Sequence, residues 1–179
     1  MKLLSFSILL FISWLNSLFL PLGDPYKGCC GAEHVEFKME GGTVFIPNVF
    51  TPNGDGINDV FRPFYDATKI KVQNFEVSSA EKNMVWKKET FDPNVSLAGW
   101  SGNVVEDSTY TGLFNYTMTF IDSKGIQKIV SGAACSVVCK DKTPITIENK
   151  NKCFFPMQYQ KDSINHYSPL FLEVDCLKN

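Results

Sequence analysis

The sequence has few of the residues that enzymes and nucleic-acid-binding proteins need. It has only two histidines, His34 and His166, so few side chains can act as general bases near neutral pH. It contains no Gly-x-Ser-x-Gly elbow, no His-Glu-x-x-His pair and no phosphate-binding glycine loop. Basic residues are scattered, and only Lys87 and Lys88 are adjacent, whereas nucleic-acid surfaces concentrate them. We expect no enzyme, no small-molecule substrate and no nucleic-acid partner.

Long helical periods are also absent. Short apolar runs alternate with polar residues and are separated by clusters of Gly, Pro, Asn and Asp, which is typical of an all-β domain. The clearest strand is 113–121, where apolar residues alternate with Asn and Thr, so one face should lie on the core. Regular spacing of short strands predicts an Ig-like antiparallel β-sandwich. The other predicted strands are 34–38, 43–50, 70–77, 84–87, 127–131 and 135–139.

One predicted strand changes parity along its length. Ile70 and Val72 point to one face, whereas Phe75 and Val77 point to the other. A β-bulge near Asn74 would turn both halves toward the same core.

The chain is predicted to have four parts. Lys2 and the apolar run 3–22 are typical of a signal peptide over residues 1–23, with an uncleaved anchor as the alternative. A short N-terminal segment, 24–42, leads into the sandwich, 43–140. Residues 141–179 lose the strand rhythm but keep apolar residues and two cysteines, which indicates an extension strapped to the domain rather than a free tail. The leader predicts an exported protein, at the cell surface or outside the cell.

Six cysteines form an even set behind the predicted leader, which favours disulfides over free thiols. Zinc would need a tighter pattern, because two of the cysteines lie far from the Cys-x-x-x-Cys pair. Gly28 before Cys29 also allows an outer-membrane lipoprotein as an alternative, which would leave five thiols. The spacing leaves the pairing open among Cys29, Cys30, Cys135, Cys139, Cys153 and Cys176.

The most informative stretch, 45–61, reads Phe-Ile-Pro-Asn-Val-Phe-Thr-Pro-Asn-Gly-Asp-Gly-Ile-Asn-Asp-Val-Phe. It resembles the opening motif of the gliding-motility-associated C-terminal domain family, the type B sorting domain of type IX secretion cargo in the Bacteroidetes. Segments 83–86, 99–102, 112–116 and 131–140 resemble later parts of that domain. The motif positions are Pro47, Asn48, Phe50, Thr51, Pro52, Asn53, Gly54, Asp55, Gly56, Asn58, Asp59, Phe61, Trp100, Gly102, Gly112 and Tyr116.

This resemblance implies a module that serves secretion or surface attachment by contacting type IX secretion or other cell-envelope proteins. It covers 43–140, about the size of one Ig-like domain. Only about twenty residues separate the leader from Thr43, too few for a folded passenger without staples, and the extension follows Lys140. We therefore expect a free-standing relative of the sorting domain.

The motif also has physical properties of its own. Pro47 and Pro52 withhold N–H donors, which suits a sheet edge that leads into a loop. Several oxygen-bearing side chains then share a tight turn, as in calcium loops. The alternative is that they accept hydrogen bonds from nearby amides and need no ion, and apart from this calcium ion we expect no cofactor. The candidate ligands are Asn53, Asp55, Asn58 and Asp59.

Two further interpretations remain beside the sorting-domain hypothesis. Trp100, in a glycine-rich turn, is predicted to pack on the core, and the alternative is an exposed sugar-stacking platform in a calcium- or glycan-binding module. A hydrolase would have to use His34 with Glu33 and Glu36. We interpret these two carboxylates instead as solvated residues of a strand face.

Overall fold

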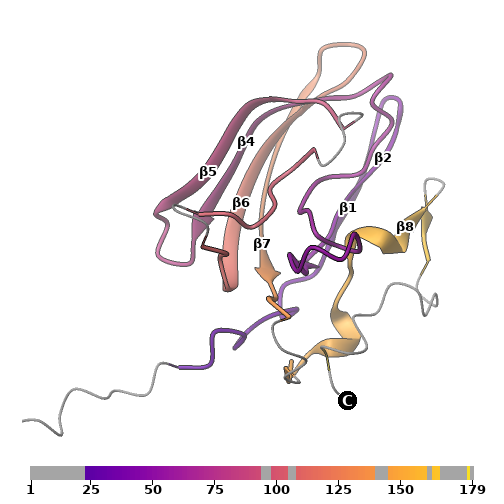
Figure 1. The fold of residues 1–179 in the computed structure, drawn as a ribbon. Helices are drawn as coiled ribbons and strands as arrows, with labels where there is room; N and C mark the ends of the chain where they lie inside the picture. Colours follow the sequence, from indigo (N-terminus) through magenta and orange to yellow (C-terminus); the bar gives the residue numbers. More distant parts are fainter. Residues whose placement is uncertain are drawn as a thin grey trace, which may run out of the picture.

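A computed structural model of the chain describes residues 23–93, 98–104, 108–139, 145–160, 163–165 and 177. The predicted signal peptide lies outside these residues except for Gly23. The described part consists mainly of strands and forms the predicted all-β sandwich (Figure 1). Within it, no helix has the length and apolar character needed to cross a membrane.

The larger layer is a five-stranded sheet with the order β3-β7-β6-β4-β5. Its neighbours are antiparallel except for β3 and β7, which pair in parallel with Val49 opposite Cys135. The antiparallel prediction is therefore wrong for this one pair. The strands are β3 (Val49–Phe50), β4 (Lys71–Ser79), β5 (Met84–Phe91), β6 (Gly112–Ile121) and β7 (Gln127–Ser136).

Two of the predicted strand boundaries are wrong at β7. The segments 127–131 and 135–139 were expected to be separate strands, but β7 pairs with β6 without a break from Gln127 to Ser136. Gly132 does not interrupt the strand, because the Tyr116 side chain occupies the space beside it where a larger residue would place its Cβ.

The second layer is built around the hairpin of β1 (Val35–Met39) and β2 (Gly42–Ile46). Isolated bridges extend it, from Phe45 to Phe64 and from Phe61 to Trp100. The predicted strand 43–50 is thus two strands in different layers, because the chain crosses between the sheets at Pro47, which has no N–H to continue the ladder. Strand β1 precedes Thr43, so the sandwich includes part of the predicted N-terminal segment.

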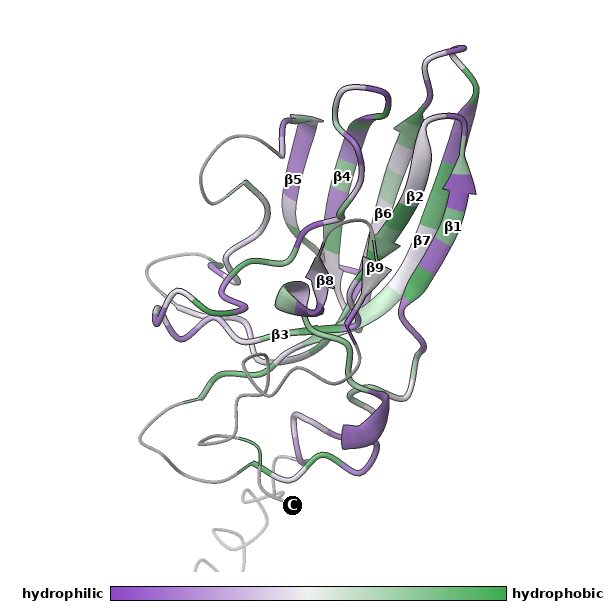
Figure 2. Cartoon of the chain, turned by 90° about the vertical axis from the view of Figure 1, so that its right-hand side faces the viewer, coloured by the Kyte–Doolittle hydropathy of each residue, from purple (hydrophilic) through white to green (hydrophobic). Residues whose placement is uncertain are grey.

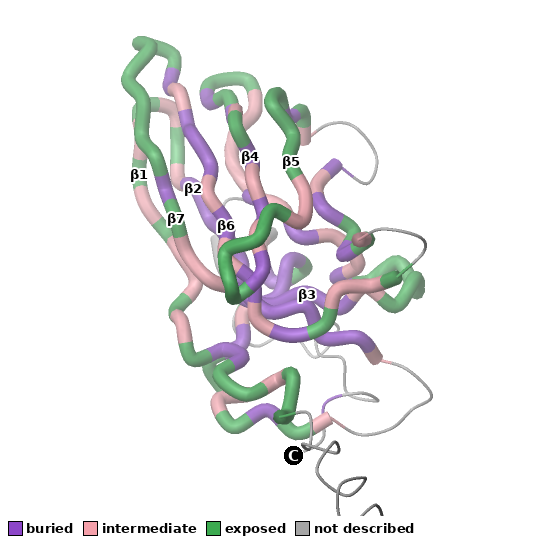
Figure 3. The backbone as a smooth tube through the Cα atoms, turned by 90° about the vertical axis from the view of Figure 1, so that its left-hand side faces the viewer, coloured by how far each residue is buried: buried purple, intermediate pink, exposed green. Residues whose placement is uncertain are grey.

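Between the layers lies an apolar core to which most strands contribute. On β6, Phe114, Tyr116, Met118 and Phe120 are buried on one face, as the alternation predicted. Apolar and polar bands alternate along β4 in Figure 2. Figure 3 shows the buried β3 in the interior, while the turns at the far ends of the hairpins are exposed.

The bulge predicted in β4 is confirmed. The register between β4 and β6 shifts between Gln73 and Glu76, and Asn74 has a φ of 49°. Val72 and Phe75 are both buried in the core although they lie three positions apart. The extra residue at Asn74 therefore turns both halves of the strand inward.

The extension is strapped to the sandwich, as predicted. Disulfides join Cys29 to Cys135 and Cys30 to Cys153. Cys139 is also disulfide-bonded, and Cys176 lies outside the described residues. The described elements of the extension are η2 (Lys150–Lys152), η3 (Pro156–Gln158), β8 (Tyr159–Gln160) and β9 (Ser163–Ile164).

Aromatic contacts fasten the extension to the outer face of β2, beside which it runs in Figure 1. The Tyr159 ring stacks on Phe45 with centroids 5.4 Å apart, and Phe154 lies 4.1 Å from the His34 ring. His34 is thus packed among aromatic rings. Glu33 and Glu36 are exposed, as expected for solvated residues.

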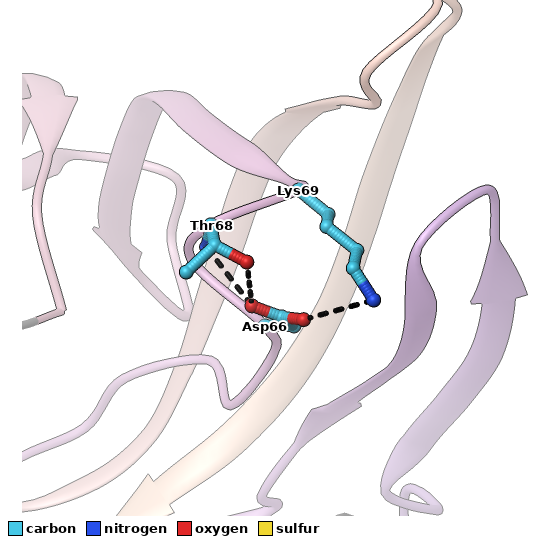
Figure 4. A network of polar contacts seen from close by, with 3 residues as sticks. All are labelled: Asp66, Thr68 and Lys69. Carbon is cyan, nitrogen blue, oxygen red and sulfur yellow. Dashed lines mark hydrogen bonds and ion pairs between the residues drawn. The ribbon is translucent and has the colours of Figure 1, made fainter.

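Asp66 organises the turn that leads into β4 (Figure 4). Its Oδ1 accepts hydrogen bonds from the Thr68 hydroxyl at 2.6 Å and the Thr68 N–H at 2.9 Å, and its Oδ2 lies 3.4 Å from Lys69 Nζ. These contacts hold the pKa of Asp66 below its ordinary value of 3.8, and the hydrogen bond from the Thr68 hydroxyl has the largest effect.

This lowered pKa predicts part of the acid sensitivity of the fold. Ionised Asp66 stabilises the folded state fully above pH 3.8, and the contribution is lost as the pH falls through the lower folded-state pKa. Melting temperatures of the wild type and Asp66→Asn, measured from pH 2 to pH 6, should differ at pH 6 and converge in acid. Parallel curves across this range would contradict the assignment.

Candidate recognition site

The buried half of the motif packs against the glycine-rich turn at residues 99–102. The Phe50 ring lies 5.9 Å from Phe61 and 5.5 Å from Trp100, and Trp100 lies 4.9 Å from Phe114. Trp100 is only 1% exposed and donates its Nε1–H to the Asn103 carbonyl. Its predicted core packing is confirmed, and the sugar-stacking alternative is wrong because no face of the ring is accessible.

Gly99 allows this close packing of the motif and the turn. Its φ is 128°, and a Cβ at this position would lie 2.6 Å from Val60 Cγ1. No larger residue fits there without moving the chain at the end of the motif.

Asn48 joins the motif to both ends of the described chain. It is 1% exposed, and its Nδ2 donates to the Ala32 carbonyl at 2.9 Å and the Lys152 carbonyl at 2.8 Å. Its Oδ1 accepts the Phe154 N–H at 2.7 Å. The side-chain amide thereby provides hydrogen bonds to three backbone groups that lie outside the strands.

The exposed half of the motif is a loop tip, residues 53–57, whose backbone is held by its own side chains. Asp59 accepts the N–H groups of Asn53 and Gly54 on Oδ1, at 3.0 and 2.6 Å, and that of Gly56 on Oδ2 at 2.7 Å. Asp55 accepts the Ile57 N–H at 2.8 Å. This dense bonding fixes the conformation of an exposed loop that has no strand partner.

The backbone hydrogen bonds expected under the alternative to a calcium site are present. The Asp59 carboxylate faces three amides, and Asn53 and Asp55 bond to each other at 3.0 Å. Asn58 is buried, and its Oδ1 accepts the Met157 N–H at 3.0 Å, so it joins the loop to the extension. The described residues contain no cluster of three or more acidic, His or Cys side chains.

Sequence reasoning missed a cleft beside the loop. It has a volume of about 150 Å³ and lies between the motif and the extension, with Gly56, Val60, Arg62, Phe64, Pro156 and Met157 among its lining residues. One signal was present in the sequence: Arg62 is its only arginine, among sixteen lysines. Three lining residues, Ala98, Pro156 and Met157, come from segments distant in sequence, which no local pattern reveals.

The bonds of Asp59 predict a local effect of its removal. In Asp59→Ala, hydrogen exchange at the amides of Asn53, Gly54 and Gly56 should accelerate roughly tenfold or more, while the free energy of unfolding falls by only about 1 kcal/mol. Asp59→Asn, which keeps one acceptor oxygen, should have a smaller effect. Unchanged exchange at these three amides in Asp59→Ala would show that the side chain does not order the loop.

Comparisons with protein-family models, with curated proteins and with solved structures found no match for this chain.

Proposed function

We propose that the protein is an exported, non-enzymatic module of the sorting-domain type, and that its loop tip is the surface recognised by a type IX secretion or other cell-envelope protein. The observation that carries the proposal is that the apolar and the polar residues of the motif have different structural roles. Its apolar residues build the core, while its Asn and Asp residues hold an exposed loop in one conformation. A preordered loop loses little conformational entropy when a partner binds.

The disulfides support the export part of this proposal. The two described bonds join the N-terminal segment to β7 and to the extension, and such bonds persist in oxidising compartments outside the cytoplasm. The extension packs on the sandwich, so the module is one folded unit in the part of the chain described. Its own surface would then carry the function.

The test compares delivery of the full chain in a Bacteroidetes host and in an isogenic strain without a working type IX machinery. We expect surface or extracellular protein, detected by antibody on intact cells and in the medium, only in the competent strain. A tip variant, Asp55→Ala with Ile57→Ser, should lose delivery while keeping its melting temperature within a few degrees.

The matched control, Met84→Ser with Glu89→Ala, changes two exposed residues of edge strand β5 and should be delivered like the wild type. Equal delivery of the wild type in both strains would refute the type IX route. Normal delivery of the folded tip variant would refute the role of the loop.

A further inference from the structure

Arg62 lies in the cleft between the motif and the extension, where its side chain makes one hydrogen bond to the described residues. Its guanidinium stacks on the Phe64 ring, with Cζ 5.0 Å from the centroid, and makes a single long hydrogen bond, 3.4 Å, to the Pro93 carbonyl. No ion pair involves Arg62 among the described residues. Burial lowers its pKa, and the coulombic effect of Tyr65 offsets this only in part, as expected for a cation that has lost water.

The composition of the cleft limits the anion that could complete this site. Among the described lining residues Arg62 is the only basic one, and Asp59, also in the lining, has its oxygens turned to the loop amides. A dianion such as a phosphate would meet one cation and one fixed negative charge. A carboxylate carries a single charge and matches the planar fork of a guanidinium.

The walls and the size of the cleft limit the rest of the ligand. Val60, Phe64, Ala98, Pro156 and Met157 make the lining mainly apolar. The volume of about 150 Å³ is well below the roughly 300 Å³ at which sites for whole small molecules begin. It suits one medium-sized apolar side chain, so the occupant is the end of a longer molecule.

We propose that this cleft binds the C-terminal residue of a partner polypeptide, with the free α-carboxylate on Arg62 and an apolar side chain between Val60, Phe64 and Met157. The site adjoins the loop tip, with which it shares Gly56, but its ligand is bound by Arg62, and the proposal stands independently of the export function. Capture of a terminal carboxylate is a recurring mode of peptide recognition.

Binding is tested on the full, oxidised chain with fluorescein-labelled peptides that end in Ser-Ala-Leu. We expect the free-acid peptide to bind at least tenfold more tightly than the same peptide with a C-terminal amide, because hydrogen bonds to charged groups are the strong ones. Peptides that end in Val, Ile or Phe extend the panel. Equal binding of acid and amide, or no binding by any peptide up to millimolar concentration, overturns the proposal.

Arg62→Met should weaken binding of the free-acid peptide by about 10- to 100-fold. The matched control is Lys128→Met, which removes a cation stacked 4.0 Å from the Phe37 ring, away from the cleft, and should leave binding unchanged. An Arg62→Met variant that binds like the wild type refutes the site.

A second variant keeps the test decisive if Arg62→Met does not fold. Met157 is 41% exposed at the cleft, so Met157→Asp should fold. Its carboxylate should repel that of the free-acid peptide and weaken binding by tenfold or more. The affinity should also become more sensitive to salt. Unchanged affinity refutes the proposal. Free isovalerate that competes as strongly as the peptide would show a site for small acids, which also refutes it.

Discussion

Replacing Asn48 with alanine is expected to lower the free energy of unfolding by roughly 3–5 kcal/mol, a large fraction of the stability of a single domain. The substitution leaves the Ala32 and Lys152 carbonyls and the Phe154 N–H without their side-chain partner in a partly buried region. Each such unsatisfied group costs about 1–3 kcal/mol. Urea unfolding at pH 7 with the disulfides intact measures the change.

Asn115→Ala is the matched control for this prediction. Asn115 makes one side-chain bond, from Nδ2 to the Ser79 carbonyl at 3.0 Å, on a half-buried strand face, so its loss should cost only about 1 kcal/mol. If the two variants are equally stable, Asn48 is not the junction described above.

Asn48→Asp sharpens the test, because a carboxylate at this position would face two carbonyl oxygens. Burial and these oxygens would raise the pKa of the introduced acid in the folded state. The destabilisation should therefore grow as the pH rises above the unfolded-state pKa of about 4, and shrink in acid. A penalty that does not change with pH would contradict this placement of the amide.

Removing both described disulfides should cost more than the sum of the two single removals. While Cys29–Cys135 is intact, Cys30–Cys153 closes a loop of only about 18 residues, because Cys29 and Cys30 are adjacent. The chain-entropy model then gives about 3 kcal/mol for either bond alone. With both bonds gone, a loop of more than 100 residues also opens, and the model gives about 8 kcal/mol.

The measurement is urea unfolding of Cys29→Ala with Cys135→Ala, of Cys30→Ala with Cys153→Ala, and of the fourfold variant. We expect the fourfold variant to lose about 2 kcal/mol more than the two pairs added together. If the fourfold variant is fully unfolded in buffer, its loss cannot be measured directly. In that case, a free energy of unfolding of the wild type that exceeds the sum of the two measured losses also supports the prediction. Strict additivity would refute the shared loop.

The features that the sequence predicted depend on local alternation. The inward residues of β6 and the bulge at Asn74 follow from a period of two on a strand with one buried face. Disulfides followed from an even number of cysteines behind an apolar leader. The burial of Trp100 followed from its place in a glycine-rich turn of a small sandwich.

The features that the sequence did not predict depend on contacts between distant segments. The parallel pair of β3 and β7 and the pairing of the cysteines bring together residues about a hundred positions apart. The role of Asn48 depends on Phe154, 106 residues further on. The cleft of Arg62 likewise needs the extension to fold back beside the loop, which leaves no periodic trace in the chain.

The adjacent cysteines have a consequence for how the chain matures. Cys29 and Cys30 are made long before Cys135 and Cys153, and nothing in their shared sequence neighbourhood distinguishes their partners. The pairing of β7 with β6 sets the position of Cys135, so a chain that oxidises before these strands pair can form exchanged bonds that have to be broken again. Because uncatalysed reshuffling takes up to hours, we expect a catalyst of disulfide exchange to speed the oxidative refolding of the reduced chain.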